Sequence, residues 1–126
     1  MRRFTPVTGI WGLSRIDAED QARFFLRIDA LTPRRHRAYA MRLLSHITPS
    51  QRWGIGRVRT PPGWRLYFKG GWGSGTGAVD HQVALLTNGA RRVSLAILTA
   101  QDGSHAYGKE TLRRIARLLI GRLPAE

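Results

Sequence analysis

Apolar and polar positions recur along this chain with two different periods, and the first half carries the helical one. Residues 1–16 are broken by Pro6, Gly9 and Gly12 and are expected to be irregular. A helical stripe then predicts a helix over about residues 18–30, with Asp17 as its cap. The stripe consists of Phe24, Phe25, Ile28 and Leu31.

A second helix is predicted after Thr32-Pro33, with Pro33 at its first position. Thr48-Pro49 ends it, because the residue before a proline disfavours helical geometry. Its predicted buried stripe consists of Tyr39, Leu43, Leu44 and Ile47. Residues 49–63 are rich in glycine and proline and are expected to form a loop.

The second half changes to a period of two. Trp64, Leu66 and Phe68 alternate with polar positions and predict a strand that ends at Lys69. A second strand has the expected inward positions Val79, His81, Val83 and Leu85. Asn88-Gly89 is a strong hairpin signal and leads into a third strand over residues 93–98. After a turn at Asp102-Gly103, a final helix is expected to bury Leu112, Ile115, Ala116 and Leu119.

The order of elements is two helices, three antiparallel strands and one helix. Consecutive strands indicate the α+β class rather than alternating α/β. We expect the C-terminal helix to pack on one face of the sheet, and the other face and one edge to need partners. At 126 residues, the chain has the length of one domain or part of one, and we treat 1–126 as a single partial domain.

The amino-acid composition excludes several kinds of chemical site. There are no cysteines, so disulfides, thiolate metal sites and a cysteine nucleophile are excluded. His36, His46, His81 and His105 lack ligand-like spacing, so neither a metal nor another cofactor is predicted, and His81 is expected to be a satisfied sheet histidine. No apolar run is long enough to span a membrane and no signal peptide is predicted, which leaves localisation open.

The net charge of +13 admits a small basic nucleic-acid-binding module as an alternative function. The nineteen arginines are scattered, however, and the one tight cluster is Arg34-Arg35-His36-Arg37. We expect non-specific binding to polyanions at low salt from any protein this basic. Selectivity among targets at physiological salt would be needed to support the nucleic-acid function.

The segment Lys69-Gly70-Gly71-Trp72-Gly73-Ser74-Gly75 carries the most informative chemistry. Lys69 is one of only two lysines, and it is followed by glycines that leave backbone N–H groups open. A mobile cation beside open N–H groups suits an anion or a developing oxyanion. A solvated lysine at the end of a strand, followed by an ordinary turn, is the alternative interpretation.

This arrangement resembles the C-terminal part of a class A β-lactamase or a related penicillin-binding serine hydrolase, over about residues 9–123. The family has a Lys-Thr-Gly or Lys-Ser-Gly triad on the strand beside its active site, and Lys69 and Gly71 match its first and third positions. The segment from Gln51-Arg52-Trp53-Gly54 to Gly75 is particularly similar to the actinobacterial serine hydrolases. The resemblance implies a β-lactam or peptide substrate and acyl transfer through a serine.

By the same resemblance, Lys69 would hold the substrate carboxylate and support proton transfer, and the backbone N–H of Trp72 would supply half of an oxyanion hole. Gly70 and Gly71 would allow substrate to approach the backbone, and Ser74 would replace the hydroxyl that Gly70 lacks. None of the chain's serines is followed three residues later by lysine, so the family's Ser-x-x-Lys nucleophile is missing. We therefore expect a C-terminal fragment that is inactive alone; a non-catalytic binding remnant is a further alternative.

Overall fold

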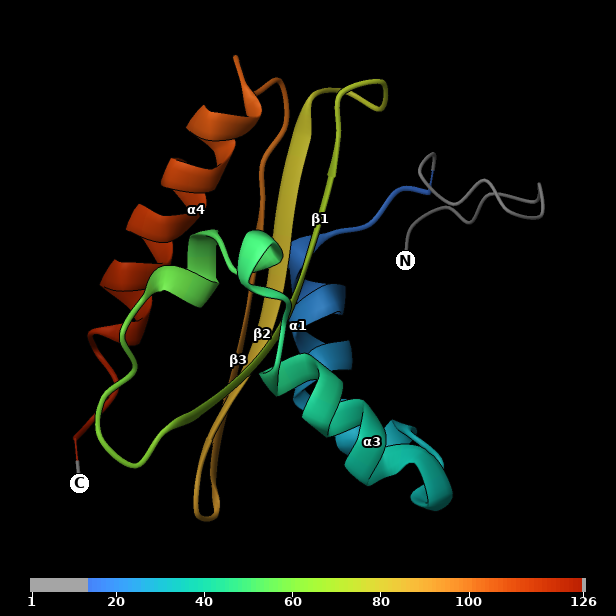
Figure 1. The fold of residues 1–126 in the computed structure, drawn as a ribbon, viewed down its shortest axis with the longest axis vertical. Coiled ribbons are helices and arrows are strands. Elements are labelled where there is room, and N and C mark those ends of the chain that lie inside the picture. Colours follow the sequence, from blue (N-terminus) through green and yellow to red (C-terminus); the bar gives the residue numbers. More distant parts are fainter. Residues whose placement is uncertain (1–13, 126) are drawn as a thin grey trace.

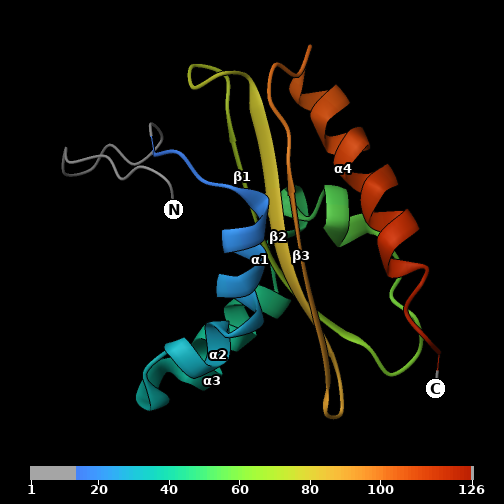
Figure 2. The ribbon, with the colours of Figure 1, turned by 180° about the vertical axis from the view of Figure 1, so that it is seen from behind.

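A three-stranded antiparallel sheet lies between two helical layers in the computed structural model, which describes residues 14–125 (Figure 1). The strands follow the order β1–β2–β3, and they are β1 (Arg65–Gly73), β2 (Val79–Asn88) and β3 (Arg91–Leu98). The helix α4 (His105–Ile120) covers one face. The helices α1 (Ala18–Leu26), α2 (Ile28–Leu31) and α3 (Arg34–Ser45) lie on the other side (Figure 2). The predicted α+β class is confirmed.

The main core lies between the sheet and α4. Phe68 of β1, Ala84 and Leu86 of β2, and Leu112 of α4 are fully buried there. Two short 3-10 helices, η1 (Pro49–Gln51) and η2 (Gly54–Arg57), replace part of the predicted loop. Ile55 of η2 is also fully buried, because η2 packs against α4.

Gln82 explains how η2 is held on the sheet. Its side chain is 1% exposed. The backbone N–H of Ile55 donates to Oε1 of Gln82 at 2.6 Å, and Nε2 of Gln82 donates to the carbonyl of Trp53 at 3.0 Å. One buried amide thus satisfies two backbone groups of a segment that has no strand to pair with. The more deeply buried face of β2 is therefore the one with Gln82, Ala84 and Leu86, which lies under η2 and α4. The opposite face, with His81 and Val83, was wrongly predicted from the sequence as the buried one.

The opposite face is covered in part by α1, which packs against β2 and β3. Phe25 and Leu85 are buried in this layer. Arg92 of β3 holds the helices to the sheet through two hydrogen bonds to Asp29, at 2.7 and 3.0 Å. The face that was expected to need partners is therefore covered in part by α1 of the same chain. On this face, Nδ1 of His81 is buried and has no hydrogen-bond partner within residues 14–125, so the expectation of a satisfied sheet histidine is wrong.

The single helix predicted over residues 18–30 is interrupted. Arg27 has φ −114° and ψ 11°, and its N–H donates to the carbonyl of Phe24 at 3.1 Å, so α1 ends and α2 begins there. Pro33 is the N-cap of α3 and not its first residue. The predicted stripe of α3 is not buried, since Tyr39 is 65% and Leu43 51% exposed.

Two further boundaries differ from the prediction. β1 does not end at Lys69 but continues to Gly73, because residues 69–73 pair in register with residues 79–83 of β2. The buried face of α4 uses Leu112, Ala116 and Ile120, whereas Ile115 and Leu119 are partly exposed. The hairpin at Asn88-Gly89 is confirmed, with Gly89 at φ 56°. The irregular segment predicted over residues 1–16 lies outside the described residues as far as residue 13.

Candidate functional site

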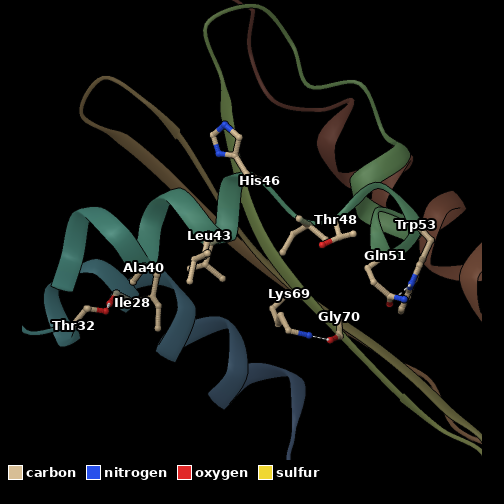
Figure 3. A pocket seen from close by; sticks show the side chains of 12 residues that line it. Ile28, Thr32, Ala40, Leu43, His46, Thr48, Gln51, Trp53, Lys69 and Gly70 are labelled. Carbon is tan, nitrogen blue, oxygen red and sulfur yellow. Dashed lines mark hydrogen bonds between the residues drawn. The ribbon is translucent and has the colours of Figure 1, made fainter.

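A groove of about 500 Å³ runs along the outer edge of β1 (Figure 3). Lys69 and Gly70 form its strand wall. The helical wall is mainly apolar and includes Ile28, Ala40, Leu43 and Leu44, and the far end is closed by Gln51 and Trp53. β1 is an edge strand, and no other strand pairs with its outer side within residues 14–125. The groove therefore gives a ligand access to strand backbone beside one cation.

Lys69 is the cation of this groove. Its side chain is exposed, and Nζ donates a hydrogen bond to the carbonyl of Gly70, as Figure 3 shows. No carboxylate lies among the residues that line the groove. An anionic ligand would therefore meet a lysine that donates to a backbone carbonyl and faces no carboxylate of the groove lining.

The other predicted site residues lie on both faces of β1 and do not all line the groove. Trp53 faces Gly70, since a Cβ at Gly70 would lie 3.1 Å from Cη2 of that ring. Gly71 points to the opposite face, where a Cβ would meet nothing within 4 Å. Trp72 and Ser74 line a separate cavity of about 220 Å³ at the end of β1. The structure thus brings Lys69 and Gly70 together in the groove but places Ser74 elsewhere.

The cavity beside Trp72 contains a pair that the sequence analysis missed. Nδ1 of His105 lies 2.6 Å from Oδ1 of Asp80, and Asp80 is 2% exposed. Burial raises the pKa of the Asp80 carboxyl, although the hydrogen bond from His105 opposes that shift. The available signal was the position of Asp80 on the same strand face as Gln82 and Ala84, where an acid needs a partner.

His105 also holds the ring of Trp72. The two rings are stacked, with centroids 5.3 Å apart and an interplanar angle of 25°. Trp53 completes the cluster with edge contacts to Trp72 at 6.0 Å and to His105 at 5.3 Å. The end of β1 that carries the proposed oxyanion donor is therefore fixed by aromatic contacts to α4 and to the segment before η2.

Two negative findings apply to the described part of the chain. Among residues 14–125, no group of three or more histidine, aspartate or glutamate side chains could hold a metal ion. None of the helices in this range has the length and apolar character needed to cross a membrane.

Fold and groove together define an α+β domain with a lysine on an edge strand beside a mainly apolar groove. A family model described as the beta-lactamase enzyme family matches residues 10–123. The chain belongs to the beta-lactamase enzyme family. No curated protein matches it.

Solved structures share the fold at low sequence identity. A chromosome-encoded β-lactamase of Vibrio parahaemolyticus is 13% identical, with a TM-score of 0.72, over 94% of this chain and 48% of that one. A β-lactamase from Burkholderia ambifaria is 20% identical, with a TM-score of 0.70, over 98% of this chain and 50% of that one. A structure named PBP-A gives 16% identity and a TM-score of 0.54, over 82% and 38%. The chain spans about half the length of these β-lactamases.

Proposed function

We propose that this chain supplies the lysine side of an acyl-transfer site that hydrolyses a β-lactam or a peptide amide. The observation that carries the proposal is the position of Lys69 and Gly70 on an open edge strand beside the groove. A substrate carboxylate placed in the groove would neutralise the one cation of its strand wall. The family to which the chain belongs makes a β-lactam or its peptide analogue the substrate class of choice.

Each residue of the strand has a part in this proposal. Lys69 holds the substrate carboxylate and supports proton transfer at the nucleophile. Gly70 and Gly71 let substrate approach the backbone, and the N–H of Trp72 donates to the oxyanion. Ser74 would reach only substrate groups that extend past Trp72, because it lines the cavity with His105.

The nucleophile must come from polypeptide outside this sequence, since no serine here belongs to a Ser-x-x-Lys motif. One oxyanion donor without a nucleophile cannot carry out acyl transfer. We therefore propose that the 126-residue chain is inactive alone. The half-length coverage of the structural relatives and the exposed Leu43 beside the groove support a requirement for a complementary half.

The test compares the chain alone with the chain fused to the N-terminal half of the Burkholderia ambifaria β-lactamase. Hydrolysis of a chromogenic cephalosporin and the mass of an acylated protein are the two measurements. We expect no turnover from the chain alone and an acyl adduct from the fusion. Lys69→Ala should lower turnover by the fusion by roughly 10²-fold or more, as removal of a transition-state donor does.

Lys109→Ala is the matched control, because Lys109 is the other lysine and lies on α4. It should leave turnover unchanged. Burst turnover by the chain alone would contradict the missing-nucleophile argument. A folded fusion that binds benzylpenicillin through Lys69 without forming an adduct would replace the catalytic proposal with a binding function.

A further inference from the structure

The helices α2 and α3 form an arm that extends beyond the sheet, and the turn between them lies at the end of the arm farthest from the strands (Figure 1, Figure 2). Neither helix contains a buried residue, although α3 is 12 residues long. We call residues 31–35 the distal turn. All of them except Thr32 are exposed, so the distal turn offers a surface to a partner.

The arm is strongly basic. α3 carries four arginines among its 12 residues and no acidic residue. None of the four forms a salt bridge within residues 14–125. Asp29, the one acid of α2, is held by Arg92, and the next acid along the chain is Asp80. The described part of the chain therefore leaves the charge of α3 for a partner to neutralise.

Exposed apolar side chains accompany these arginines. Leu31 is 51% exposed at the distal turn, and Pro33 is exposed close to it. Tyr39, which is 65% exposed, follows Arg35 by four residues and precedes Arg42 by three, so these three side chains share one face of α3. This combination of basic, aromatic and aliphatic side chains is typical of a surface that lies in a membrane interface.

A phospholipid bilayer with anionic headgroups fits both properties of the arm. Arginines bind lipid phosphates while their methylene groups lie along apolar surface, tyrosine is favoured at the headgroup level, and leucine enters the acyl boundary. A nucleic-acid backbone would neutralise the same charge but would leave Leu31 in water. We infer that the distal turn, with Arg35, Tyr39 and Arg42 of α3, docks on an anionic bilayer surface without crossing it. This inference goes beyond the proposed function, because docking requires neither the groove nor a nucleophile.

The experiment measures co-sedimentation of the 126-residue chain with vesicles at physiological ionic strength. Vesicles of phosphatidylcholine with phosphatidylglycerol are compared with vesicles of phosphatidylcholine alone, and we expect saturable binding to the anionic vesicles only. Arg34→Gln/Arg35→Gln should weaken that binding about 25-fold, since each basic residue near an anionic surface contributes about fivefold. Leu31→Ser should weaken it at least about threefold, because apolar burial is lost.

Arg117→Gln/Arg122→Gln is the matched control, because it removes two exposed arginines from α4 and from the residues that follow it. It should change vesicle binding by less than about threefold, since charges far from the bilayer are screened. Equal losses in the two double variants would mean diffuse attraction by a chain of charge +13 and would contradict the inference. An unchanged affinity of Leu31→Ser for vesicles, with oligonucleotide binding that depends on Arg34 and Arg35, would assign the surface to nucleic acid instead.

Contact of the distal turn with lipid can be measured directly, because the chain has no cysteine. The emission of an environment-sensitive fluorophore on Leu31→Cys should shift to the blue when anionic vesicles are added. The same label on Leu118→Cys, at a 69% exposed position of α4, should show no shift. A shift at both positions, or at neither, would contradict docking through the distal turn.

The outcome is independent of acyl transfer, since Arg34 and Arg35 do not line the groove. In the fusion, Arg34→Gln/Arg35→Gln should leave turnover of the chromogenic cephalosporin unchanged. Vesicle binding without turnover by the fusion would support the docking surface and contradict the proposed function. Turnover without vesicle binding would do the reverse.

Discussion

His105 and Asp80 join the first turn of α4 to the beginning of β2, with Nδ1 of the histidine 2.6 Å from Oδ1 of the aspartate. The histidine ring also stacks on Trp72 at the end of β1. One side chain therefore connects a buried acid, the C-terminal helix and the strand that carries the candidate site. Because burial raises the pKa of the Asp80 carboxyl, this acid makes the stability of the region depend on pH.

Asp80→Asn should remove one component of that pH dependence. Burial raises the pKa of Asp80 above its ordinary 3.8. Between that value and the raised pKa, the folded chain holds a proton that the unfolded chain has released, so the free energy of unfolding falls as pH rises. The asparagine variant does not titrate. Its free energy of unfolding, relative to the original chain, should therefore increase through this window in denaturant titrations from about pH 3.5 to about pH 7.

Asp29→Asn is the control of opposite sign. Its hydrogen bonds with Arg92 lower the pKa of Asp29, so Asp29 stabilises the fold above its unfolded pKa and this stabilisation is lost as pH falls through the lowered value. The relative stability of Asp29→Asn should therefore decrease as pH rises. If both variants changed in the same direction, the interpretation of Asp80 would be wrong.

Gln82→Leu should destabilise the fold strongly although it places an apolar residue in the core. The substitution leaves the N–H of Ile55 and the carbonyl of Trp53 without their partner. Each unpaired buried group costs about 1–3 kcal/mol, so the two together should lower the free energy of unfolding by about 2–6 kcal/mol. Urea denaturation measures the loss.

Gln51→Leu makes the same chemical change at an exposed position, where Oε1 of Gln51 accepts a long hydrogen bond of 3.4 Å from Nε1 of Trp53. Its effect should stay within about 0.5 kcal/mol, as is usual for surface substitutions. Equal effects of the two substitutions would show that the hydrogen bonds of Gln82 do not hold η2 in place.

Local patterns predicted the order of elements because each signal lies within a few residues. The alternation of Trp64 and Phe68 and the Asn88-Gly89 turn are such signals, and both are confirmed. The end of β1 was missed because three glycines within residues 70–73 suggest a turn by composition. Pairing with residues 79–83 overrides that preference, and it becomes visible only when the partner strand is in place.

The candidate site was predictable in part for the same reason. Lys69 and its glycines form a short contiguous motif, so the resemblance could locate them. His105 and Asp80 are 25 residues apart in the sequence, so no short-range hydrophobic periodicity could predict their pairing. The apolar stripe of α3 was wrongly predicted to be buried, because Tyr39 and Leu43 have helical spacing but do not pack against the described core. Periodicity shows that a face is apolar, but it does not show what covers that face.

Gly108→Ala tests the crowding beneath the Asp80 pair. In an ordinary helix this change stabilises by about 1 kcal/mol. Here the added Cβ would lie 2.1 Å from Oδ2 of Asp80 and 2.7 Å from Oδ2 of Asp102. The carboxylates must move, so we expect a net loss of about 1–3 kcal/mol in the free energy of unfolding. Thermal or urea denaturation provides the measurement.

Gly103→Ala is the matched variant, because a Cβ there meets nothing within 4 Å. Its effect should be small. A stabilised Gly108→Ala would mean that Asp80 and Asp102 can shift without loss, and that their arrangement over α4 is not tightly determined.

Gly70→Ser restores a hydroxyl at the middle position of the Lys-x-Gly triad and tests why the chain lacks one. The new Cβ would lie 3.1 Å from Cη2 of Trp53 and 3.3 Å from Nε2 of Gln82. Trp53 is itself held against Trp72 and His105, so its ring cannot move freely. We expect the free energy of unfolding to fall by about 1–3 kcal/mol.

A double-mutant cycle with Trp53→Leu separates crowding from other effects of the serine. Trp53→Leu alone removes core packing and should destabilise the chain, but in that background Gly70→Ser should cost much less, with a coupling energy of about 1–2 kcal/mol. Gly71→Ser is the control on the opposite face, where the added atom meets open space, and it should change stability by less than about 0.5 kcal/mol. Equal costs at the two glycines, without coupling to Trp53, would contradict the explanation. With coupling, the absence of a side chain at position 70 is explained by the tryptophan ring packed against it.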